Sequence, residues 1–93
     1  MPRKLIVFSN KFDLEEYAKK ATEAGLIYKR NRQQLFDKSL IEDLRVILTL
    51  SDAHMLAGIP YSVIIYRYGK KRLNSNILNY LSSLIREPAH ATV

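Results

Sequence analysis

The chain has 93 residues, a length that supports one domain with a modest hydrophobic core and excludes two domains with a large cleft between them. Hydrophobic residues make up 47% of the sequence and charged residues 26%, which is globular composition and not that of a disordered tail. Because the sequence has no apolar run long enough for a membrane span or secretory signal, and no cysteine, we expect an intracellular, cytoplasmic protein without membrane contact.

The N-terminal part of the chain predicts a strand followed by a helix. Residues 4–9 form a short apolar run that ends at turn-prone residues, which is typical of a strand buried on both faces. Residues 13–25 place apolar side chains at helical spacing. Asp13 is the candidate N-cap of this helix, and Gly25 stands where it would end the helix in the left-handed conformation.

The middle of the chain predicts a second β element and a second helix. Residues 26–36 carry β-type side chains on both sides of a polar stretch, which fits either one strand running into a loop or a short hairpin with its tip near 31–32. Residues 39–60 begin with a candidate capping box at Ser39 and continue with an apolar stripe at helical spacing. Pro60 is expected to stop this helix.

The C-terminal part predicts a strand over residues 61–68 and a helix that starts near residue 74. The predicted order is therefore β-α-β-α-β-α, an α+β fold with three helices packed on a small sheet. We expect this single basic domain to cover residues 1–88 and to be followed by a flexible tail over residues 89–93.

Residues 49–68 also resemble the helix-turn-helix of lactose-repressor-type headpieces. Gly58 and Ile59 stand at the turn, and Ile64 stands where the recognition helix would direct an apolar side chain inward. The resemblance implies a mostly helical fold with only a short β element at 26–36. Three positions have the wrong chemistry for the motif: His54, Ile65 and Arg67. A strand over 61–68 needs no such exceptions, and the sequence leaves both interpretations open.

Positive charge gathers in the predicted strands and loops of this chain, whose net charge is +6. Residues 26–38 carry a net charge of +3 and residues 61–73 of +4, whereas residues 13–25 and 39–60 each carry −2. Such segregation favours a basic face that attracts polyanions such as nucleic acid. The candidate nucleic-acid-binding residues form two basic clusters with interleaved tyrosines: Lys29, Arg30, Arg32, Tyr66, Arg67, Tyr68, Lys70, Lys71 and Arg72.

No combination of residues predicts catalysis, a metal site or a cofactor, because the glycines are scattered and His54 and His90 lie far apart. We therefore expect a non-enzymatic nucleic-acid-binding protein, such as a DNA-binding regulator, that uses its basic face. The alternative is a small protein–protein interaction module or inhibitor that docks on an acidic partner surface. Because a small sheet has open edges that a second copy can pair, we also expect a homodimer.

Overall fold

The structure is a computed structural model that describes residues 3–68 and 73–85. Its strands are β1 (Arg3–Phe8), β2 (Ile27–Lys29), β3 (Gln34–Asp37), β4 (Leu40–Val46) and β5 (Val63–Arg67). Its helices are α1 (Lys11–Glu23), α2 (Leu50–His54) and α3 (Ser75–Ser82). The expected C-terminal tail, residues 89–93, lies outside the described residues.

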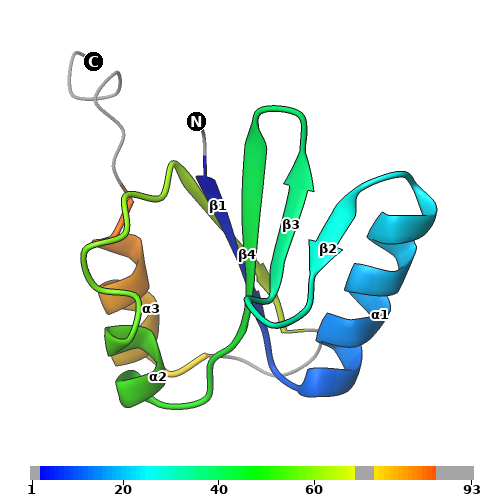
Figure 1. Cartoon of the computed structure of the whole chain (residues 1–93). Coiled ribbons are helices and arrows are strands. Elements are labelled where there is room, and N and C mark those ends of the chain that lie inside the picture. The colour runs from blue at the N-terminus through cyan, green and yellow to red at the C-terminus, as the bar shows by residue number, and fades with distance from the viewer. Residues whose placement is uncertain (1–2, 69–72, 86–93) are drawn as a thin grey trace.

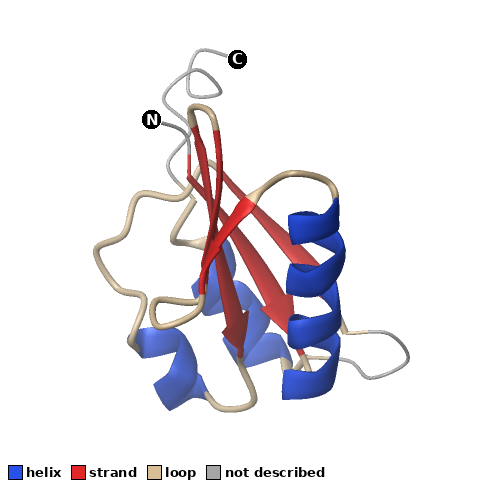
Figure 2. Cartoon of the chain, turned by 45° about the vertical axis from the view of Figure 1, so that its right-hand side comes forward, coloured by secondary structure: helices blue, strands red, loops and turns tan. Residues whose placement is uncertain are grey.

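The strands form one sheet in the order β2-β3-β4-β1-β5 (Figure 1). β1 pairs in parallel with β4 on one side and β5 on the other, while β2, β3 and β4 form an antiparallel meander. Helix α1 lies on one face of the sheet, and α2 and α3 lie on the other (Figure 2). This arrangement confirms the predicted single α+β domain with three helices on a small sheet.

β1 is the centre of the sheet and is buried on both faces, as its continuous apolar run predicts. Leu5 and Val7 join the core under α2 and α3, whereas Ile6 and Phe8 join the core under α1. This division follows from the two-residue repeat of a strand, whose successive side chains point to opposite faces. The two cores together hold the three helices on the sheet.

The predicted first and last helices are present, and their capping residues fix their ends. α1 begins three residues earlier than a cap at Asp13 implies, because Asn10 is the N-cap, and its side-chain oxygen accepts a hydrogen bond from the Asp13 backbone N–H. Gly25 follows the helix with a φ of +102°, as predicted for a left-handed C-terminal residue. α3 begins at Ser75, next to the predicted start near residue 74, and its N-cap is Asn74.

The helix predicted over residues 39–60 is wrong, because Leu40–Val46 form the internal strand β4. The carboxylates in the middle of this segment look like the solvent face of an amphipathic helix, but both are buried. Glu42 accepts a hydrogen bond from the Tyr17 hydroxyl at 2.8 Å. Asp43 is fully buried and accepts hydrogen bonds from Tyr61, from Arg3 Nε at 2.9 Å and from Gln34 at 2.8 Å. These distant partners allow a polar strand segment to be buried.

Residues 49–68 do not form a helix-turn-helix, which excludes the mostly helical alternative. After the short helix α2, the chain turns at Gly58, whose φ is +87°, and enters β5. Residues 63–67 pair in parallel with β1, as the strand interpretation predicts. The segment 26–36 forms a hairpin, β2 and β3, the second of the two possibilities left open by the sequence. Within the described residues, no helix has both the length and the hydrophobicity that crossing a lipid bilayer would require.

Candidate nucleic-acid interface

Arg32 and Arg67, one from each predicted basic cluster, lie at the two sides of the sheet, toward the same end of it. The turn between β2 and β3 contains Arg32 and lies beside Leu44 near the end of β4. Arg67 pairs with Phe8 at the end of β1. Both arginines therefore lie toward the carboxyl ends of the parallel strands, which point downward in Figure 1, whereas Lys29 lies level with Leu5 in the middle of β1. Open α/β sheets bind their ligands at this end.

The first cluster contains cations in different electrostatic situations. Arg30 forms an ion pair with Glu15 at 2.6 Å, and its guanidinium carbon lies 5.4 Å from the centre of the Tyr28 ring. The hydrogen bond from Arg30 and the negative charge of Glu15 raise the pKa of Arg30 above its ordinary value. Lys29 and Arg32 are exposed and have no acidic partner within 4.0 Å among residues 3–68 and 73–85. These two cations are thus available to an anionic ligand.

Arg45 holds the β2–β3 turn in place. Its guanidinium nitrogen Nη1 donates to the carbonyl oxygens of Arg32, Gln33 and Leu44 at 3.2, 3.1 and 2.7 Å. Gln33 needs this support, because its φ of +51° lies in the left-handed region that non-glycine residues rarely adopt. Sequence analysis missed Arg45 because it placed the residue on a helix, far from the hairpin.

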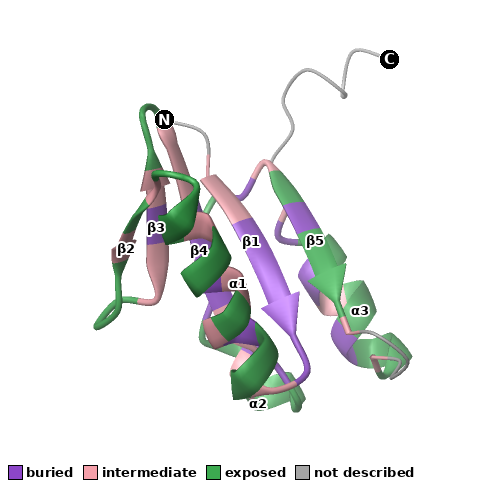
Figure 3. Ribbon diagram, turned by 90° about the vertical axis from the view of Figure 1, so that its right-hand side faces the viewer, coloured by how far each residue is buried: buried purple, intermediate pink, exposed green. Residues whose placement is uncertain are grey.

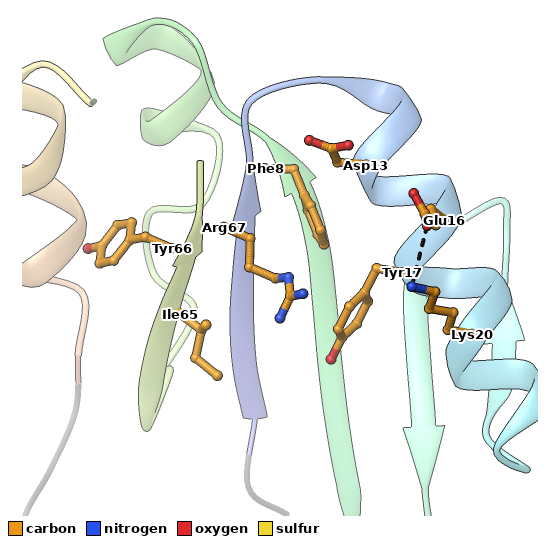
Figure 4. A pocket seen from close by; sticks show the side chains of 8 residues that line it. All are labelled: Phe8, Asp13, Glu16, Tyr17, Lys20, Ile65, Tyr66 and Arg67. Carbon is orange, nitrogen blue, oxygen red and sulfur yellow. Dashed lines mark ion pairs between the residues drawn. The ribbon is translucent and has the colours of Figure 1, made fainter. Parts of the chain in front are cut away.

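Arg67 extends from β5 into a surface groove of about 510 Å³ between this strand and α1 (Figure 4). Its guanidinium carbon lies 5.1 Å from the centre of the Tyr17 ring, a cation–π contact across the groove. No carboxylate lies within 4.0 Å of Arg67 in the described part of the chain. Glu16 on the far wall of the groove pairs with Lys20 at 3.4 Å instead.

The acidic residues near this end of the sheet are already bound within the protein. Asp13 accepts a hydrogen bond from the Asn10 side chain at 3.0 Å. Asp52 accepts the backbone N–H groups of Leu48 and Thr49 at 3.0 and 3.1 Å, and these bonds lower the pKa of Asp52. Glu15 is the partner of Arg30. Asp13 and Asp52 are held by neutral donors and keep their negative charge, but the exposed cations without an acidic partner among the described residues, Lys29, Arg32 and Arg67, outnumber these two carboxylates.

The two predicted tyrosines do not stand beside the cations as stacking platforms. Tyr66 points away from Arg67, on the side of α3 (Figure 4). Tyr68 packs against the core under α2 and α3, and its hydroxyl is buried without a hydrogen-bond partner among the described atoms. Burial raises the pKa of both hydroxyls. The remaining predicted residues, Lys70, Lys71 and Arg72, lie outside the described residues.

A different aromatic residue is exposed at this end. Phe12, in the first turn of α1, is 86% exposed and follows Lys11, which is exposed as well. Sequence analysis did not single out Phe12, because an aromatic residue near a helix start more often packs into the core. Its exposure beside a lysine is the kind of surface on which an unpaired base can stack.

No family model, curated protein or solved structure matches this chain. The site is therefore interpreted from its own chemistry. Within residues 3–68 and 73–85, no three histidines or carboxylates gather as metal ligands. The two buried carboxylates have their donors inside the protein: Glu42 joins β4 to Tyr17 of α1, and Asp43 joins β4 to Arg3 of β1 and Gln34 of β3.

Proposed function

We propose that this protein binds nucleic acid through the carboxyl end of its sheet, by contacts to phosphates. The observation that carries the proposal is that Arg32, in the turn after β2, and Arg67, at the end of β5, lack acidic partners among the described residues and lie toward the same end of the sheet. Lys29, at the end of β2, also lacks an acidic partner there. Such contacts position a protein on nucleic acid without reading its sequence.

The spacing of the two clusters suits an extended polyanion. β2 and β5 are four strand spacings apart, which corresponds to about 19 Å across the sheet. A duplex of that length carries roughly 11 phosphate charges along its axis. One nucleic-acid segment can therefore contact Arg32 and Arg67 together, whereas a small anion can contact only one of them.

The direct test is a binding isotherm with duplex and single-stranded oligonucleotides of equal length, measured at several salt concentrations. For the variant Lys29→Gln/Arg32→Gln, the slope of log K against log salt on duplex should shrink by about 0.9 for each lost contact. Arg67→Gln should shrink it further by about 0.9. Phe12→Ala should weaken single-strand binding more than duplex binding, because only unpaired bases can stack on the ring.

Lys38→Gln is the matched control for these variants. Lys38 is exposed in the β3–β4 turn at the opposite end of the sheet, so this change removes a positive charge without touching the proposed surface. Equal losses in Lys38→Gln and in the other variants would show that net charge alone attracts the polyanion. An isotherm without measurable binding would contradict the proposal.

Lys70, Lys71 and Arg72 follow Tyr68 in the sequence and stay a prediction. The triple change of these residues to alanine should cost only a few tenths of a kcal/mol each in stability, as surface substitutions do. The same change should weaken duplex binding at low salt. A pull-down with and without nuclease separates the two expected kinds of partner, since capture of an acidic protein would survive nuclease treatment.

A further inference from the structure

β5 is an outer strand with an apolar, uncovered surface. One edge of β5 pairs with β1, and the other edge has no strand beside it in the described part of the chain. Helix α1 crosses the sheet away from β5 (Figure 3), so this face of β5 is open. Val63 and Ile65 are 36% and 39% exposed on it, whereas Ile64, on the opposite face under α3, is 9% exposed.

The unpaired backbone groups of β5 belong to its even-numbered residues. The Phe8 carbonyl accepts a hydrogen bond from the Ile47 N–H at 3.2 Å and so points toward β4. Because the hydrogen-bonding direction alternates along a strand, Leu5 and Val7 direct their N–H and C=O groups toward β5. Their register partners are Ile64 and Tyr66, and in a parallel pair they bond to the neighbours of these partners. The groups of Val63, Ile65 and Arg67 therefore point toward β1, and those of Ile64 and Tyr66 point outward. An exposed edge of this kind is a template for another strand.

We propose that this edge pairs with β5 of a second copy, antiparallel, with Ile65 on the two-fold axis. In this register Ile65 faces Ile65 of the partner subunit, and Val63 faces Arg67 of the partner subunit. In the same register Ile64 faces Tyr66 of the partner subunit. Both of these residues direct their N–H and C=O groups outward, so both outward residues of each copy form hydrogen bonds. The pairing joins the two sheets into one.

The side chains of β5 suit pairing with themselves. Arg67 is the only charged residue of the strand, and it lies at its end. In the proposed register the two arginines are four residues apart along the strands, or about 14 Å, which exceeds the screening length of about 10 Å at 0.1 M salt. On the open face an isoleucine meets an isoleucine, and on the other face Ile64 meets Tyr66 of the partner subunit. Pairs of β-branched and aromatic side chains stabilise antiparallel strands.

The test uses the full chain without nucleic acid. Light scattering at high micromolar concentration should give twice the monomer mass. Hydrogen exchange should show the amides of Ile64 and Tyr66 protected in the dimer. Ile65→Lys places two lysines opposite each other and should yield a folded monomer in which the amides of Ile64 and Tyr66 exchange fast.

Ile27→Lys is the matched control, because Ile27 is a 60% exposed isoleucine on the other outer strand, β2, and its replacement should leave the dimer intact. A monomer mass for the unmodified chain would overturn the proposal and leave the edge to a different protein. A dimer in which the amides of Ile64 and Tyr66 exchange fast would overturn it too, because the copies would then meet elsewhere. If Ile65→Lys does not fold, protection in the unmodified chain still decides the outcome.

Discussion

The two outer strands of this sheet meet their surroundings in different ways. β2 has three residues, ends in Lys29, and is followed by a turn with further cations. β5 has five residues, exposes two aliphatic side chains on its open face, and carries its one charge at its end. Short length and charge protect β2 from pairing with another chain, and β5 lacks this protection. One sheet thus has a short, charged edge at β2 and a longer, mostly apolar edge at β5.

The comparison also shows that the same residue type can serve opposite purposes. Arg30 is neutralised by Glu15, while Arg67 rests on an aromatic ring without an acidic partner. Ile27 lies on β2, a short outer strand next to several cations. Ile65 lies on the longer outer strand β5, between two residues whose backbone groups have no partner strand. Residues of the same type therefore differ in which groups they can bind, because their neighbours in the fold differ.

The largest expected effect comes from the residue that ties the two halves of the sheet together. Asp43→Ala leaves Arg3, Gln34 and Tyr61 without their shared acceptor and should lower the free energy of unfolding by about 3 kcal/mol in urea denaturation. Asp37→Ala, an exposed change on β3, is the control and should stay within about 0.5 kcal/mol. A loss below about 1 kcal/mol for Asp43→Ala would show that the network contributes little.

A second prediction compares the two faces of β5. Ile64→Ala creates a cavity in the core under α3 and should cost about 3 kcal/mol. Ile65→Ala should cost less than about 1 kcal/mol when unfolding is measured at a protein concentration too low for dimers. Similar losses for both variants would mean that the open face of β5 is already covered in the monomer.

A third prediction concerns the link between α1 and β2. Gly25→Ala places a side chain at a φ of +102° and should lower the free energy of unfolding by about 1–2 kcal/mol. No atom lies within 4 Å of the added methyl group, so a clash cannot be the cause of the loss. An unchanged urea midpoint would show that the backbone relaxes at no cost and that β2 is loosely held.

The smallest expected effect is a change of stability with pH. Burial, followed by the hydrogen bond to Glu42 and the charge of Glu42, raises the pKa of Tyr17 from 10.0 to about 12. The unfolded chain therefore loses this proton first, and stability should fall as the pH rises from 10 to about 12. Tyr17→Phe removes this proton and should flatten the alkaline decline in thermal melts. An equally steep decline in the variant would assign the effect to other tyrosines.

Sequence patterns predicted the parts of this fold whose determinants are local. Three such determinants are the apolar run of β1, the glycine after α1 and the cap of α3. Each depends only on residues close to it in the sequence. β4 could not be predicted, because its identity depends on partners 25 residues away at Tyr17, 18 residues away at Tyr61 and 40 residues away at Arg3. When these distant partners are unknown, Glu42 and Asp43 in the middle of β4 look like the solvent-exposed face of a helix.

Some features of the candidate site could also be predicted from the sequence, and others depend on the folded structure. The clustering of Lys29, Arg32 and Arg67 outside the acidic segments is visible in the sequence. The pairing of Arg30 with Glu15 and the support of the turn by Arg45 depend on folded distances, and no local pattern encodes them. The exposed ring of Phe12 likewise depends on which face of α1 meets the sheet.

The most direct test of the account is the salt dependence of duplex binding in a variant that changes both outer strands. If one duplex contacts both, the loss of slope in Arg32→Gln/Arg67→Gln should equal the sum of the two single losses, about 1.8 in total, with unchanged melting temperature. A double variant whose slope equals that of the unmodified chain would contradict the claim that these two strands bind phosphates. A slope that responds to only one of the two arginines would contradict the claim that they share a ligand.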